Sequence, residues 1–131
     1  MRFAPAAATR RGLMDQLRHD WAAAHVLRTA FPTVQQLRIE LRFAEPASNA
    51  PTPQSHVLYP PARAFFAYPC PYADCNGQFD LASAVIAAMS DATQQAGGVL
   101  ECSGSRGGDH SRRPCLLRVV YEITASFQQK G

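Results

Sequence analysis

The stretch TVQQLRIELRF at residues 33–43 alternates polar and apolar residues from Gln36 to Phe43. Because successive side chains of a strand point to opposite faces of a sheet, the alternation predicts a strand with one buried face. The face predicted to be buried holds Leu37, Ile39, Leu41 and Phe43, and the polar face holds Gln36, Arg38, Glu40 and Arg42. Such a strand is typical of an antiparallel sheet that is covered on one side only.

A matching stretch, CLLRVVYEITASF at residues 115–127, predicts a second long strand. Its in-phase apolar residues are Leu117, Val119, Tyr121, Ile123 and Phe127. Shorter strands are predicted at residues 64–68 and 99–102. We therefore expect a mainly antiparallel sheet of about four strands.

An N-terminal helix is predicted from Thr9 to about Thr29, because apolar residues recur there at helical spacing. Thr9 is a suitable N-cap, and Phe31-Pro32 ends the pattern. The predicted apolar stripe consists of Leu13, Leu17, Trp21, Ala24 and Leu27.

A central helix is predicted over residues 79–98, with Asp80 as its N-cap and Gly97 at its C-terminal end. Its predicted buried stripe consists of Leu81, Val85, Ala88, Met89 and Ala92. The proline-rich stretch at residues 44–63 is predicted to be a long loop, since proline interrupts helices and sheets.

The length of 131 residues fits one domain with its own core. We expect a single α+β domain over residues 1–131, with a helical segment at 1–32. No stretch approaches the roughly 20 apolar residues of a membrane helix. Arg10-Arg11 resembles the start of an export signal, but Asp15, Arg18 and Asp20 interrupt the apolar run that such a signal needs. We expect a cytoplasmic protein.

The formal net charge is +3, and 12 of the 13 basic residues are arginine. Arginine forks suit phosphate, which raises nucleic acid as a partner. The codon usage of a GC-rich genome would produce the same bias.

Four cysteines, Cys70, Cys75, Cys102 and Cys115, lie at predicted strand ends or turns. Two such corners can converge on one ion, and Zn²⁺ binds four thiolates in a tetrahedron. Pro71 and Asn76-Gly77 would shape the first corner, because Asn and Gly tolerate the positive φ that lets backbone N–H groups point at the thiolates.

Alternatives to a metal remain open. Disulfides would require export, a redox pair usually has the shorter Cys-x-x-Cys spacing, and four unrelated buried thiols would give the same count. His110 could also replace one cysteine as a ligand.

The segment CPYADCNG at residues 70–77 resembles the metal loop of zinc-ribbon and zinc-knuckle proteins. It also resembles small bacterial four-cysteine zinc-binding proteins without known activity, which share the arrangement Cys-Pro…Cys-x-Gly-x-Phe-Asp. The chain differs from the ribbon pattern in having four residues between the first two cysteines and twelve between the last two. The resemblance implies a structural Zn²⁺ and no catalytic residues.

Two functions are considered beyond metal binding. Basic and aromatic residues near the cysteines could hold RNA or single-stranded DNA by phosphate contact and stacking. These candidates are Tyr72, Arg106, His110, Arg112 and Arg113. Alternatively, the chain is a protein-interaction or assembly subunit, with the proline-rich loop or the helix of Trp21 facing the partner. A zinc hydrolase or deaminase is disfavoured because the His-x-Glu pair of the deaminases is missing.

Overall fold

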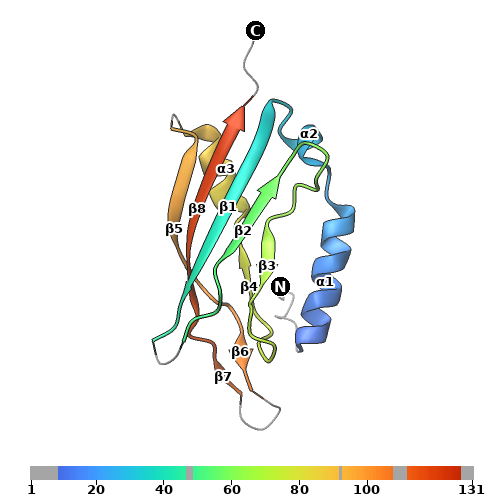
Figure 1. Cartoon of the computed structure of the whole chain (residues 1–131). Helices are drawn as coiled ribbons and strands as arrows, with labels where there is room; N and C mark the ends of the chain where they lie inside the picture. Colours follow the sequence, from blue (N-terminus) through green and yellow to red (C-terminus); the bar gives the residue numbers. More distant parts are fainter. Residues whose placement is uncertain (1–8, 47–48, 92, 108–111, 128–131) are drawn as a thin grey trace, which may run out of the picture.

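A computed structural model of the chain describes residues 9–46, 49–91, 93–107 and 112–127, shown in Figure 1. Within these ranges, helices and strands alternate irregularly along the chain. In chain order they are α1 (Arg10–Ala23), α2 (Leu27–Ala30), β1 (Val34–Ala44), β2 (Gln54–Leu58), β3 (Ala67–Pro69), β4 (Gln78–Asp80), α3 (Ala82–Ser90), β5 (Gln95–Glu101), β6 (Ser105–Arg106), β7 (Arg113–Pro114) and β8 (Arg118–Phe127).

The main sheet has four antiparallel strands in the order β2-β1-β8-β5. The two long strands predicted from the alternation are neighbours at its centre, with Ile39 opposite Ile123. Two short hairpins, β3–β4 and β6–β7, complete the strands. The predicted α+β class with a four-stranded antiparallel sheet is therefore confirmed.

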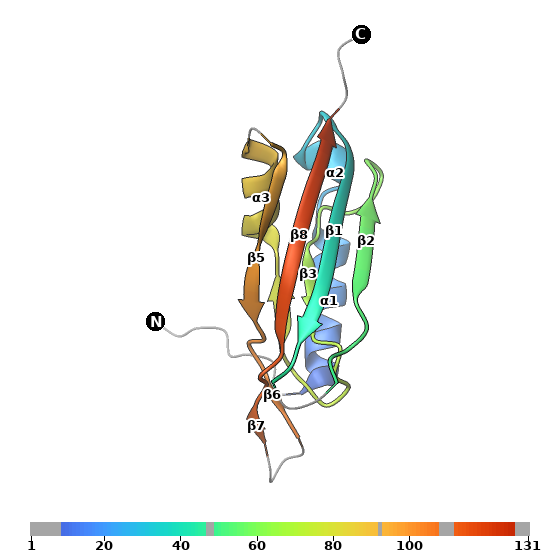
Figure 2. The same ribbon diagram turned by 60° about the vertical axis from the view of Figure 1, so that its left-hand side comes forward.

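One face of the sheet carries the core, and the other face is open. Figure 1 and Figure 2 show α1, α3 and the β3–β4 hairpin on the same side of the sheet. Helix α3 packs on β5 and β8, and α1 packs on β3. On the open face the strands present polar side chains such as Arg38, Arg42 and Thr124, in agreement with the alternation.

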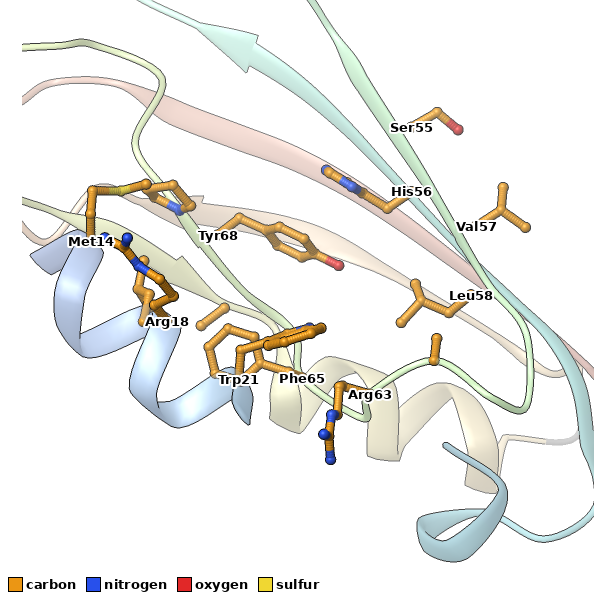
Figure 3. A pocket seen from close by; sticks show the side chains of 14 residues that line it. Met14, Arg18, Trp21, Ser55, His56, Val57, Leu58, Arg63, Phe65 and Tyr68 are labelled. Atoms are coloured by element: carbon orange, nitrogen blue, oxygen red, sulfur yellow. The ribbon is translucent and has the colours of Figure 1, made fainter. Parts of the chain in front are cut away.

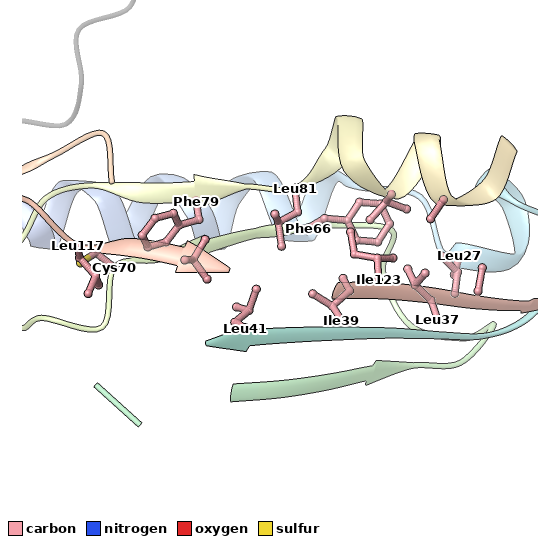
Figure 4. Close-up of a cluster of buried hydrophobic side chains, with 14 of the residues drawn as sticks. Leu27, Leu37, Ile39, Leu41, Phe66, Cys70, Phe79, Leu81, Leu117 and Ile123 are labelled. Carbon is pink, nitrogen blue, oxygen red and sulfur yellow. The ribbon is translucent and has the colours of Figure 1, made fainter. Parts of the chain in front are cut away.

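The core is one continuous apolar cluster that includes three of the cysteines. Figure 4 shows Leu37, Ile39 and Leu41 of β1 pointing toward Phe66 and Phe79. At one end the same cluster contains Cys70, Cys75 and Cys115. The cysteine site is thus continuous with the core and does not form a separate module.

The N-terminal helix is shorter than predicted. Thr9 caps it as expected, because its side chain accepts a hydrogen bond from the Gly12 N–H. However, α1 ends at Ala23, and the chain then turns so that Val26 forms a bridge with Arg63 before α2 begins. Trp21 is not part of the buried stripe, since half of its surface (50%) is exposed.

The predicted helix over 79–98 is wrong at both ends. Its N-terminal residues form β4, although the Asp80 carboxylate does accept a hydrogen bond from the Ala82 N–H at the helix start. The helix ends at Ser90, and Gln94 has a positive φ of 59° in the turn that follows. Gly97 lies inside β5 because pairing with β8 holds that segment extended. Ala92 lies outside the described residues.

The proline-rich segment is not a loop throughout, because it contains the edge strand β2 between Pro53 and Pro60. Prolines flanking an edge strand cost no central hydrogen bonds. The strand predicted at 64–68 is displaced to β3, which pairs with β4 outside the main sheet. The strand predicted at 99–102 begins earlier, as β5. Among the described residues, no helix is long and apolar enough to cross a membrane.

Candidate metal centre

The four cysteines come from four separate chain positions that meet at one end of the main sheet, the lower end in Figure 1. Cys70 follows β3, Cys75 precedes β4, Cys102 follows β5, and Cys115 lies between β7 and β8. The strand ends therefore determine where each thiol lies. Cys70, Cys75 and Cys115 are buried, and Cys102 is partly buried.

The sulfur positions match a tetrahedral site. All four Sγ atoms lie within 4.8 Å of one another. The Sγ atoms of Cys70 and Cys115 are 3.9 Å apart, and those of Cys75 and Cys102 are 3.5 Å apart. A Zn²⁺ tetrahedron with bonds of about 2.3 Å has sulfurs about 3.8 Å apart, whereas a disulfide needs about 2.05 Å. All four thiols are free, so disulfides do not account for the cluster.

The backbone holds the sulfurs in two matching halves. In the first half, the Gly77 N–H donates to Cys75 Sγ (3.3 Å), and the Gly77 carbonyl accepts from the Cys70 N–H (3.0 Å).

The second half repeats this arrangement. The Gly104 N–H donates to Cys102 Sγ (3.4 Å), and the Gly104 carbonyl accepts from the Cys115 N–H (3.0 Å). Each glycine thus links the two cysteines of its own half, and each aims an N–H at a sulfur that would carry negative charge as a ligand.

The two glycines are required for close approach and not for backbone conformation. Gly77 and Gly104 lie back to back, and a Cβ on Gly77 would lie 2.5 Å from Cys102 Sγ and 2.7 Å from Gly104 Cα. Among the described glycines, Gly107 alone has a positive φ. The expectation that a positive φ at Gly77 shapes the site is therefore wrong, because the absence of a side chain is what the packing needs.

A polar link joins the two halves beside the glycines. The Asn76 side-chain oxygen accepts from the Ser105 N–H (2.8 Å), and the Asn76 N–H donates to the Ser105 carbonyl (3.3 Å). The Ser103 hydroxyl contacts the backbone of Gln78. These bonds fix the β3–β4 hairpin against the β6–β7 hairpin.

The four thiols differ in their pKa values. Hydrogen bonding from Cys70 lowers the pKa of Cys102 to about 5. The same contact, together with burial, raises the pKa of Cys70, while burial raises the pKa of Cys75 and raises that of Cys115 to about 12. The cluster alone thus favours one thiolate, because further negative charges would repel one another. A divalent cation would remove that restriction.

Arg10 binds the first cysteine loop from α1. Its guanidinium donates to the backbone carbonyls of Cys70 (2.7 Å), Tyr72 (2.8 Å) and Cys75 (3.2 Å). The interaction fixes the start of α1 to the loop that holds Cys70 and Cys75. Nothing in the sequence identifies Arg10, because its contacts lie some 60 positions away along the chain.

Several residues of the predicted basic and aromatic surface contact other residues of the same chain. The Arg106 guanidinium lies 3.7 Å from the centre of the Tyr72 ring and pairs with Asp74 at 3.0 Å. Arg112 donates to Ser105 and to the Gly107 carbonyl.

Arg113, on β7, is exposed. Together with Arg112 it lines a shallow depression of about 310 Å³, whose other wall is the Cys102 turn at Ser103 and Gly104. His110 lies outside the described residues.

Comparisons with protein-family models, with curated proteins and with solved structures found no match to this chain. The site therefore stands on its own geometry: four cysteines that could bind a metal ion, held by two glycine turns.

Proposed function

We propose that the chain is a non-enzymatic zinc-binding protein in which one Zn²⁺, held by Cys70, Cys75, Cys102 and Cys115, is structural. The observation that carries the proposal is the set of sulfur separations, which fit a four-thiolate tetrahedron. The likeness of residues 70–77 to zinc-ribbon loops supports zinc, although tetrahedral sulfur sites also suit iron.

A structural role follows from the ligand set. Catalytic zinc sites keep one position open for water, whereas four thiolates complete the coordination sphere. When bound, a structural Zn²⁺ supplies folding free energy, on the order of 10 kcal/mol in small zinc domains. Here the ion would join β3–β4, β5 and β8 at one point. The closed coordination sphere argues against a hydrolase or deaminase. Free thiols also suit a reducing compartment such as the cytoplasm, which we propose as the location.

Metal analysis of the protein purified under reducing conditions tests the proposal. We expect one zinc per chain, and Co²⁺ substitution should give the absorption spectrum of a four-thiolate site. A stoichiometric amount of iron would correct the metal, and a spectrum with an exchangeable water ligand would contradict the structural role.

We also propose that the β6–β7 hairpin contacts the phosphates of RNA or single-stranded DNA. Arg112 and Arg113 flank the depression beside the metal turn, and no carboxylate of the described residues pairs with either one. Since Arg106 covers a face of Tyr72, phosphate contact is the main expected contribution and base stacking the smaller one.

Salt titration of binding to a fluorescent single-stranded oligonucleotide tests this role. Replacing both Arg112 and Arg113 by Ala should weaken binding and lower the salt slope by about 1.4, since each phosphate contact contributes about 0.7 on single strands. The matched control replaces Arg38 and Arg42 by Ala on the open sheet face, which removes the same charge and should leave the slope unchanged. Binding that is absent, or equally reduced in both double variants, would refute the proposal.

A further inference from the structure

A groove of about 640 Å³ lies between α1 and the edge strand β2, away from the proposed phosphate surface. Figure 3 shows Met14, Arg18 and Trp21 projecting from α1 on one side, His56 and Leu58 on β2 on the other, and Tyr68 between them. A volume of this size is typical of ligand sites in proteins.

The strand beside the groove has a free edge. In the described part of the chain, β2 pairs only with β1, at the end of the sheet order β2-β1-β8-β5. Four consecutive residues, Ser55 to Leu58, line the groove. Because alternate residues of a strand point to opposite faces, four in a row can reach one groove only along the strand's edge. The groove therefore runs beside unpaired backbone groups, which are a template for an added strand.

Apolar side chains are exposed along this groove. Trp21 is 50% exposed and Met14 36%, so two of the large exposed apolar residues of the described chain lie along this groove. Apolar side chains exposed along a groove are a frequent feature of interaction sites. The stacked rings of His56 and Tyr68, with centres 4.3 Å apart, give the groove a firm base that bridges β2 and β3.

The charge of the groove is positive. Its lining holds Arg18 and Arg63 and no carboxylate. Arg63 lies over the Trp21 ring at 5.4 Å and donates to the Ala24 carbonyl, while Arg18 pairs with Asp15 at the surface. That surface pair is largely exposed and leaves the Arg18 charge available to a ligand.

We propose that this groove binds an extended peptide segment of a partner protein, which adds as a strand to the free edge of β2 and carries both apolar and acidic side chains among the alternate residues that face the groove. Apolar side chains would pack against Trp21 and Phe65, and acidic ones would meet Arg18 and Arg63. Main-chain hydrogen bonds provide affinity in this mode, and the alternate side chains provide specificity.

The test selects binders from a displayed library of random peptides of about ten residues, the upper end of usual strand lengths. The target is the full chain loaded with zinc. Selected peptides without tryptophan are then titrated while the fluorescence of Trp21, the only tryptophan of the chain, is recorded. We expect enriched peptides that carry both apolar and acidic residues at every second position and that shift this emission to shorter wavelength.

Two variants and one control locate the contact. Trp21→Ala should weaken binding about thirtyfold, measured with labelled peptide, as is usual for a central aromatic anchor. Arg18→Glu should weaken acidic peptides and spare uncharged analogues. Ile86→Ala removes a side chain of similar exposure (57%) on α3 and should have no effect. Thermal melting confirms that each variant is folded.

Backbone pairing is tested with N-methylated peptides. In an antiparallel pair, alternate residues direct their N–H groups to the neighbouring strand. N-methylation of one alternating set should abolish binding, and methylation of the other set should be tolerated. The proposal is overturned if no peptide is enriched over the unselected library, or if both methylated sets bind alike. It is also overturned if the loaded protein forms a dimer that Trp21→Ala abolishes, because the occupant would then be a second copy.

Discussion

Gly104→Ala adds a single methyl group and should nevertheless strongly destabilise the metal centre. The new Cβ would overlap the backbone N and Cα of Gly77 and lie 2.7 Å from the side-chain oxygen of Asn76. Ordinary contacts at such a carbon begin at 3.4 Å, so even the Asn76 approach is 0.7 Å too short. Since the closest neighbours are backbone atoms of the other half of the site, they cannot rotate away.

The expected magnitude follows from the parts that must move. Overpacking of well-packed sites costs about 1–3 kcal/mol, and we place this backbone overlap at about 3 kcal/mol. For a chain of this size that corresponds to a loss of about 10 °C in melting temperature. The overlap would also displace the N–H of residue 104, which donates to Cys102 Sγ. Loss of a hydrogen bond to a metal ligand typically reduces metal affinity about 10–100-fold.

Far-UV circular dichroism of the zinc-loaded protein measures the melting temperature, and competition with a chromophoric chelator measures the metal affinity. Gly97→Ala is the matched control, because its Cβ would meet only the Tyr121 carbonyl oxygen at an ordinary 3.4 Å. The reasoning is refuted if Gly104→Ala melts and binds metal as the wild type does, or if the control is damaged equally.

Three further predictions concern the anchoring of the site, the core and the metal. Arg10→Met should lower the free energy of unfolding, measured in urea, by about 2 kcal/mol, because it removes charge-assisted hydrogen bonds to three carbonyls. The control Arg11→Met changes an exposed neighbour and should leave the free energy of unfolding unchanged. Leu117→Ala, at a fully buried position, should lower the free energy of unfolding by about 2–5 kcal/mol in the same assay. The control Leu116→Ala, at a position that is 59% exposed, should lower it by less than about 0.5 kcal/mol. Equal losses of stability in the two variants would contradict the packing. A strong chelator should lower the melting temperature of the wild type but not that of Cys102→Ser, and equal sensitivity of the two would show that the stabilising metal lies elsewhere.

The two long strands could be predicted because each has one face in the core, so burial leaves a period of two in the sequence. The pairing of Ile39 with Ile123 fulfils that pattern. Residues 79–98 could not be divided correctly, since the alanine-rich run is compatible with a helix and β5 depends on pairing with β8. Non-local pairing of this kind outweighs local propensity.

For the site, the cysteines themselves were predicted because four thiols at predicted strand ends suit one shared metal ion. Arg10 could not be found, because its role exists only once α1 lies against the cysteine loop. Gly77 was noticed, but for backbone freedom and not for its close contact with Gly104. The groove beside β2 was missed for a similar reason, since the sequence gives no sign that a proline-flanked loop forms a sheet edge.

X-ray absorption at the zinc edge of the protein purified in reductant tests the central claim most directly. The geometry predicts a single shell of four sulfurs at about 2.3 Å from the metal. A shell containing nitrogen or oxygen, fewer than four sulfurs, or a protein that holds no metal would contradict it.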